Sequence, residues 1–213
     1  MKILLHICCA PCLIYPLEQL KEKGFEVQGF FYNPNIHPLA EYENRRQAVE
    51  DLRKTTQIDV IYPEYKPQEF FQAVNLGKAL LDSGLRRNDG KDEGDSGRRN
   101  DEDLVRRNDE GRVEDKPQRC SLCWALRLRQ TAKIAKEKGF DYFTTTLLVS
   151  PYQDQELLKK IGSDIAETQG IDFYYEDFRP GFRRARNEAK AKGIYCQKYC
   201  GCMYSETEKL KKR

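Results

Sequence analysis

The sequence lacks any long apolar run. No stretch of about 18 apolar residues occurs among its 213 residues, which argues against a membrane-spanning helix. Met1 and Lys2 lead directly into a short apolar segment rather than into the core of a signal peptide. These absences predict a cytoplasmic protein without a membrane partner. The length suits one ordinary domain that buries its own core.

Two functional signatures are also missing. The Cx3Cx2C motif of radical-SAM enzymes does not occur, and no glycine-rich phosphate loop follows the first apolar segment. Apolar residues make up only 39% of the chain and charged residues 33%, so part of it is expected to lie outside the core. The net charge of +3 is too small to indicate a nucleic-acid partner by itself.

Residues 83–115 are the part that does not fit a core. Arg-Arg-Asn-Asp begins three times, at Arg86, Arg98 and Arg106, and the segment holds eight basic and eleven acidic side chains but few apolar ones. We therefore expect one domain over residues 1–213, with a low-complexity, disordered insertion at 83–115. Its net negative charge disfavours the alternative, an RNA-binding peptide.

Elsewhere, apolar segments typical of strands and of helices alternate. This alternation predicts an α/β fold with three layers and a mostly parallel sheet. The expected strands are 2–9, 26–32, 60–62, 142–149 and 171–175, and the expected helices are 16–23, 41–56, 68–81, 122–138, 154–167 and 182–192.

The eight cysteines fall into three groups. They lie in HICCAPC at 6–12, CSLC at 120–123 and CQKYCGC at 196–202. Without an export signal, a reducing compartment is expected, where clustered cysteines bind metals or catalyse redox reactions rather than form stable disulfides.

The first two groups predict a metal site. Residues 8–12 occupy the turn after the first strand, where parallel sheets bind ligands. Cys120 and Cys123 lie where a helix is expected to begin, and its dipole favours thiolates. Four thiolates suit a zinc ion or an iron–sulfur cluster, and adjacent Cys8 and Cys9 favour the cluster because neighbouring cysteines can reach different irons. Cys12 remains a buried thiol, a second-metal ligand or a substrate contact.

The third group predicts a redox-active dithiol. A disulfide between Cys200 and Cys202 closes a very small ring, so it is strained and easily reduced. Cys196 is an alternative partner in that pair, or a ligand to a second metal or substrate. Extra metal ligation or inert thiols are the structural alternatives for the whole group.

Residues 179–198 gather positive charge around these thiols. They contain seven Lys and Arg residues and one acid, Glu188. Phe178, Phe182 and Tyr195 are interleaved with them and would stack on exposed bases, so the stretch predicts a single-stranded RNA or tRNA-loop surface. A solvated basic helix is the alternative.

Five ordered motifs resemble the epoxyqueuosine reductase family of the QueH type. They are LLHICCAPC at 4–12, FFYNPNIHPLAEYENR at 30–45, RCSLCWALRLRQTA at 119–132, FTTTLLVSPYQ at 143–153 and GIYCQKYCGCMYS at 193–205. The resemblance covers nearly everything except residues 83–115.

The resemblance implies a HUP-like (Rossmann-like) fold and a cobalamin-independent oxidoreductase. Its reaction is the two-electron removal of the epoxide oxygen from epoxyqueuosine at the wobble position of tRNA, which gives queuosine. A [4Fe-4S] cluster, a further iron and an electron donor that the sequence does not identify are also implied. Carried over by motif, the cluster ligands are Cys8, Cys9, Cys120 and Cys123, and the redox pair is Cys200 and Cys202.

Substrate contacts are expected from the same motifs. The candidates are Tyr32, Asn33, Asn35, Glu41, Arg45, Tyr152 and Gln153. The two asparagines offer amides to a base or its diol, although Asn-Pro also makes turns; Arg45 offers a phosphate contact. Tyr32, Tyr152, Glu41 or a thiol are candidate proton donors. His6, in an apolar strand, is expected to be a core histidine.

Two other functions compete with this hypothesis. A zinc-stabilised RNA-binding module without catalysis would bind tRNA and carry no iron. A thiol–disulfide oxidoreductase acting on proteins would need no metal at all.

Overall fold

The computed structural model describes residues 1–82 and 116–210, so the predicted insertion at 83–115 lies outside the described residues. In chain order the elements are β1 (Lys2–His6), α1 (Ala10–Glu22), β2 (Glu26–Phe30), α2 (Leu39–Thr56), β3 (Val60–Ile61), α3 (Pro67–Asp82), α5 (Lys116–Glu137), β4 (Tyr142–Thr145), η1 (Thr146–Val149), α6 (Gln155–Gln169), β5 (Asp172–Phe173), η2 (Arg179–Gly181), α7 (Phe182–Ala191) and α8 (Met203–Leu210).

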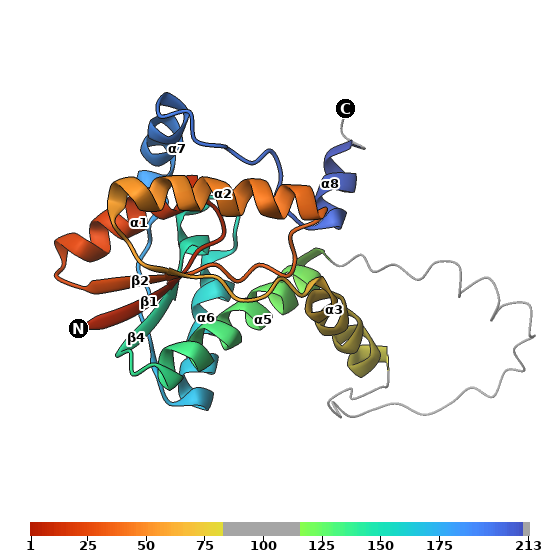
Figure 1. Ribbon diagram of the computed structural model, residues 1–213. Helices are drawn as coiled ribbons and strands as arrows, with labels where there is room; N and C mark the ends of the chain where they lie inside the picture. The colour runs from red at the N-terminus through yellow and green to blue at the C-terminus, as the bar shows by residue number, and fades with distance from the viewer. Residues whose placement is uncertain (83–115, 211–213) are drawn as a thin grey trace, which may run out of the picture.

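Five parallel strands form one sheet in the order β3-β2-β1-β4-β5. Helices α1, α2 and α7 cover one face, and α5 and α6 cover the other (Figure 1). α3 packs against α5. The predicted three-layer α/β fold is confirmed.

The central strand β1 positions the site. Its residues Ile3, Leu4 and Leu5 are fully buried, as expected for a strand with helices on both faces. The chain builds β2 and β3 on one side of β1 and then crosses to build β4 and β5 on the other. The strand order therefore reverses beside the carboxyl end of β1, the usual ligand site of such sheets.

Local signals set the limits of α6. Its N-cap residue Asp154 accepts a hydrogen bond from the Leu157 backbone N–H at 3.0 Å. Its last turn ends at Gly170, which has a φ of 65° and donates its N–H to the Ala166 carbonyl.

Several predicted boundaries were wrong near the site. β1 ends at His6 rather than at residue 9, and α1 begins at Ala10 rather than at 16. Proline fits the first helical turn because it needs no N–H partner there, and Pro11, not Pro16, occupies that position. Cys12 is thus in the first turn of a helix.

Three further differences concern the C-terminal half. β4 ends at Thr145 instead of 149, because Thr145 accepts a hydrogen bond from the Leu147 N–H and starts the 3-10 helix η1. The last strand shortens from 171–175 to β5. Helix α8 was not predicted.

No helix of the described residues is long and apolar enough to cross a membrane.

Candidate active site

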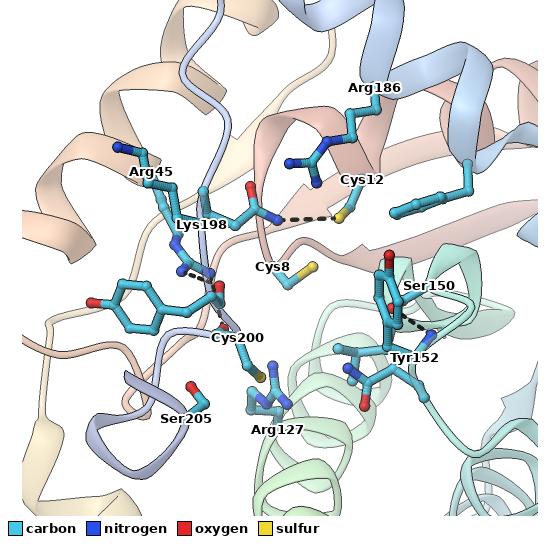
Figure 2. A pocket seen from close by; sticks show the side chains of 15 residues that line it. Cys8, Cys12, Arg45, Arg127, Ser150, Tyr152, Arg186, Lys198, Cys200 and Ser205 are labelled. Carbon is cyan, nitrogen blue, oxygen red and sulfur yellow. Dashed lines mark hydrogen bonds between the residues drawn. The ribbon is translucent and has the colours of Figure 1, made fainter. Parts of the chain in front are cut away.

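A cavity of about 730 Å³ opens at the carboxyl ends of β1 and β4 (Figure 2). Its walls come from the β1–α1 turn, α1, α2, α5, η1 and the loop after it, α7, the C-terminal loop and α8. The lining residues are Cys8, Cys12, Arg45, Arg127, Leu147, Ser150, Tyr152, Gln153, Phe182, Arg186, Gln197, Lys198, Tyr199, Cys200 and Ser205.

Three thiols lie close together beside this cavity, and two of them, Cys8 and Cys12, line it. The sulfur atoms of Cys8, Cys9 and Cys12 all lie within 4.8 Å of one another, and we call them the thiol triad. Cys9 is the N-cap residue of α1, so the positive end of that helix dipole faces the triad. Among the described residues, no other group of three such ligands is this compact.

Neighbouring side chains hold the triad in place. The Cys8 backbone N–H donates to the Thr146 hydroxyl at 3.0 Å, and that hydroxyl lies 3.2 Å from the Cys8 sulfur. From the C-terminal loop, the Gln197 side-chain amide approaches the Cys9 sulfur at 2.9 Å and the Cys12 sulfur at 3.8 Å. The triad therefore joins three distant segments of the chain.

The three thiols do not share one acidity. Hydrogen bonds from Cys12 and Cys9 lower the pKa of Cys8 well below its usual value, although burial opposes them. Burial raises the pKa of Cys9, and donation to Cys8 raises that of Cys12. In the metal-free protein, negative charge concentrates on Cys8.

A second set of thiols lies on α5 and the C-terminal loop. The sequence predicted that Cys120 and Cys123 lie at the start of a helix. They do not, because α5 already begins at Lys116. Burial raises the pKa of Cys123 to about 12, with Arg127 acting in the opposite direction and the charges of Cys200, Cys202 and Cys120 acting in the same one. The prediction that the helix start favours a Cys123 thiolate was therefore wrong.

The predicted redox pair is held by a docked loop. Arg45 donates to the carbonyls of Cys200 and Tyr199, each at 3.0 Å, and Gly201 accepts from the His37 N–H at 2.8 Å. Cys200 faces the cavity, whereas Cys202 is buried against Cys123 and α3. Partial desolvation raises the pKa of Cys200 to about 11, with Arg127 acting in the opposite direction.

Arg127 is the residue that sequence reasoning missed. It is 2% exposed, lines the cavity and points toward Cys200 (Figure 2). Burial opposes its charge, but Cys123, Cys200, Cys8 and Cys120 raise its pKa overall. The available signal was its position four residues after Cys123, on the same face of the helix.

The predicted substrate contacts divide into two sets. Three of them, Tyr152, Gln153 and Arg45, line the cavity. Tyr152 is 83% exposed to solvent. Arg45, however, is buried and forms an ion pair with Glu41 at 2.8 Å. Its contact with a phosphate stays a prediction.

The other candidates lie behind the cavity wall. Asn33 and Asn35 are buried, and the Asn33 amide donates to the Ile7 carbonyl at 2.8 Å. Tyr32 donates its hydroxyl to Glu69, and burial raises its pKa. These three side chains and Glu41 are not among the residues that line the cavity, so their contact with substrate also stays a prediction.

Aromatic and basic residues surround the cavity opening unevenly. Phe182 packs edge-on against Tyr152, with ring centroids 5.9 Å apart. Phe178 is fully buried, so its ring is not a free stacking surface. Tyr195 donates its hydroxyl to Glu41 at 2.5 Å but is 37% exposed, so stacking of a base on its ring stays a prediction. Arg186 lines the cavity beside Phe182.

Two other residues that the sequence analysis singled out, His6 and Cys196, form hydrogen bonds within the protein. His6 is fully buried, with Nδ1 2.9 Å from the Thr145 hydroxyl and Nε2 3.1 Å from the Tyr32 carbonyl. This confirms the core histidine. The Cys196 thiol donates to the Ile194 carbonyl at 3.4 Å and does not line the cavity.

The comparisons with known proteins agree with this arrangement. A family model described as epoxyqueuosine reductase QueH matches residues 3–87 and 98–208. The chain belongs to this family. Apart from residues 1–2 and 209–213 at the ends, the match omits only 88–97, so it extends into the segment 83–115 that the motif resemblance left out.

Curated relatives carry the same description. Epoxyqueuosine reductase QueH of Thermotoga maritima is 33% identical over 212 residues, which cover 99% of this chain and 93% of the relative. The protein of that name from Dehalococcoides mccartyi is 32% identical, with 99% and 96% covered. The one from Staphylococcus epidermidis is 32% identical, with 96% and 76% covered.

The described residues fit a thiolate-bound metal. The triad supplies three sulfur atoms near one point, and Arg127 supplies positive charge that thiolates would balance. Soft sulfur ligands select zinc and iron–sulfur centres over hard cations such as magnesium. The chemistry of the site therefore agrees with a metal held by the thiol triad after β1.

Proposed function

We propose that this protein is an epoxyqueuosine reductase that acts on tRNA through an iron–sulfur centre and a dithiol. The observation that carries the proposal is the cavity itself, which brings Cys8, Cys12 and Cys200 to one space beneath an exposed aromatic side chain. Family membership supplies the reaction.

The proposed centre uses cysteines from both thiol sets. Cys8 and Cys9 would hold a [4Fe-4S] cluster with Cys120 and Cys123, and Cys12 is the alternative ligand that the triad geometry favours. When bound, such a centre supplies a redox-active Lewis acid. A further iron beside Cys12 or Cys196 remains part of the family expectation.

In the proposed reaction, the dithiol supplies the two electrons that the epoxide needs. Oxidation of Cys200 and Cys202 to a disulfide releases two electrons and two protons. The epoxide accepts both, its two C–O bonds break, a C=C bond forms, and the oxygen leaves as water. An electron donor then reduces the disulfide and restores the dithiol.

The cavity walls would bind and orient the nucleoside. Tyr152, packed against Phe182, offers a face on which a base can stack. Arg186 and Lys198 place positive charge on the same walls, where the phosphates of an anticodon loop would lie. The Gln197 amide, which contacts the Cys9 sulfur, would hold the C-terminal loop against the thiol triad.

Metal analysis tests the proposal first. We expect about four irons and four sulfides per chain in protein purified without oxygen, with a broad visible absorption band. The loaded protein should convert epoxyqueuosine in tRNA to queuosine, measured by mass spectrometry of digested nucleosides. Stoichiometric zinc in a colourless, inactive protein would contradict it.

Serine variants then assign the thiols. Cys120→Ser and Cys123→Ser should lower iron content if these residues are ligands, whereas Cys12→Ser should lower it if the triad is the actual ligand set. Cys200→Ser and Cys202→Ser should keep the iron and lose turnover. Cys196→Ser should keep both iron and turnover if this thiol, which does not line the cavity, is neither a metal ligand nor a redox partner. A loss of iron or of turnover in this variant would assign it the corresponding role.

One observation favours a second function, a zinc-stabilised RNA-binding module. The sulfur atoms of Cys8 and Cys9 are 3.8 Å apart. A tetrahedral zinc ion with Zn–S bonds near 2.3 Å also places its sulfur ligands about 3.8 Å apart. The same metal analysis separates the two functions, since the module would hold zinc and bind tRNA without changing it.

A further inference from the structure

Arg127 is a buried cation with no carboxylate partner among the described residues. Its Nε donates to the Cys123 carbonyl at 3.2 Å, and its Nη2 is buried without a hydrogen-bond partner. Arg127 lines the same cavity as Cys8 and Cys200 and points toward Cys200 (Figure 2). When ionised, the thiols of Cys123, Cys200, Cys8 and Cys120 raise its pKa.

A second buried arginine provides the contrast. Arg45 is equally buried, but it pairs with Glu41 and donates to two carbonyls. A buried charge is costly unless an opposite charge and hydrogen bonds compensate it. Arg45 has this compensation in the protein alone, whereas Arg127 would obtain it from neighbouring thiolates.

The position of Arg127 between the thiol sets indicates what compensates it. Cys8 comes from the β1–α1 turn, Cys120 and Cys123 from α5, and Cys200 from the C-terminal loop. Deprotonated together on a metal, these thiols carry several negative charges, and the guanidinium would then be paired.

We propose that Arg127 is the buried counter-ion of the thiolate-bound metal centre, and that its charge raises the reduction potential of that centre. The inference rests on the metal centre of the proposed function. Reduction adds negative charge to the centre, and a nearby cation stabilises the reduced form more than the oxidised one.

Arg127→Met tests the role because it keeps most of the side-chain volume and removes the charge. The midpoint potential of the variant, measured by spectroscopic redox titration, should become more negative. We expect at least a tenfold shift in the ratio of oxidised to reduced centre at a fixed potential, which is about 59 mV for a one-electron couple. Iron loss to a chelator should be at least tenfold faster.

Two matched variants control for other effects. Arg127→Lys keeps the charge, so its potential should stay closer to that of the wild type than the potential of Arg127→Met does. Arg129→Met makes the same substitution two residues later, at an exposed position of α5, and should change neither potential nor iron loss.

Thermal unfolding separates a counter-ion from a structural residue. Without metal, Arg127→Met should be as stable as the wild type or more stable, because it removes an unpaired buried charge. With metal, the wild type should gain more stability than the variant. Equal destabilisation of both forms, or an unchanged potential in an iron-loaded variant, would overturn the inference.

Iron content and turnover of the wild-type protein distinguish a failure of the proposed function from a failure of the counter-ion inference. If it holds no iron, the metal centre of the proposed function fails, and the counter-ion inference fails with it. If it holds iron and converts its substrate while Arg127→Met retains the wild-type potential, only the counter-ion inference fails.

Discussion

At the scale of single residues, the geometry of the proposed redox pair depends on the glycine between its cysteines. Gly201 has a φ of 118°, which L side chains rarely adopt, and a Cβ there would lie 3.0 Å from Ile36 Cγ1 and 3.1 Å from Arg45 Nη1. A larger residue at this position would therefore meet both a strained backbone angle and a steric clash. The clash arises because the loop packs against Arg45, which hydrogen-bonds to it.

Gly201→Ala should therefore displace Cys200 and Cys202. We expect a loss of reductase turnover of tenfold or more, with iron content retained, measured by the tRNA assay and metal analysis. Gly193→Ala is the control, since Gly193 has a φ of 67° but open space around its Cβ position. It should cost about 1 kcal/mol from backbone strain and leave turnover unchanged; equal losses in both variants would contradict the steric explanation.

His6 makes a second prediction at this scale. Burial lowers its pKa from 6.5 to about 3, with the charge of Arg127 acting in the same direction. Between these pH values the unfolded chain binds a proton that the folded chain does not, so the free energy of unfolding falls as the pH falls.

Metal-free protein should lose about 2 kcal/mol of stability between pH 7 and pH 5 from this residue. Urea unfolding at both pH values measures the loss. His6→Asn should be less stable at pH 7 and show a smaller pH dependence. A slope identical to that of the wild type would exclude His6 as its source.

At the scale of elements, α7 is held against α1 by a contact that leaves no spare room. A Cβ on Gly181, at the end of η2, would lie 1.9 Å from the Tyr15 ring. The guanidinium of Arg184 also lies over that ring, 5.1 Å from its centre. This packing sets where α7 presents Phe182 and Arg186 to the cavity.

Gly181→Ala should push α7 outward. We expect a loss of about 1–3 kcal/mol from overpacking and weaker tRNA binding, measured by urea unfolding and by a filter-binding assay. Tyr15→Leu combined with Gly181→Ala should recover part of both losses, because the ring is gone. Additive losses in the double variant would show that the two residues are not in conflict.

At the scale of the whole molecule, the candidate metal site is built from segments that lie far apart in the sequence. Its described lining residues come from the β1–α1 turn, α1, α2, α5, η1 and the loop after it, α7, the C-terminal loop and α8. Residues 83–115, which hold few apolar side chains, stand between α3 and α5 in the sequence. The closure of a longer loop costs only a few kcal/mol of entropy.

Replacing residues 83–115 with a short Gly-Ser linker should leave iron content unchanged. A narrower deletion of residues 88–97, the part that the family match omits, should also preserve tRNA turnover. Metal analysis and the tRNA assay measure both. A fall in bound iron in the narrower deletion would assign a structural role to that segment.

Sequence alone determined the alternation of strands and helices, the core histidine, the grouping of the cysteines and the family. These features depend on local periodicity and on contiguous motifs, which are complete in the one-dimensional chain. Only the tertiary structure decided that Cys12 joins Cys8 and Cys9, that Cys123 is buried inside a helix, and that Arg127 faces both thiol sets. Burial, electrostatic environment and the meeting of distant segments arise from packing, so no local pattern specifies them.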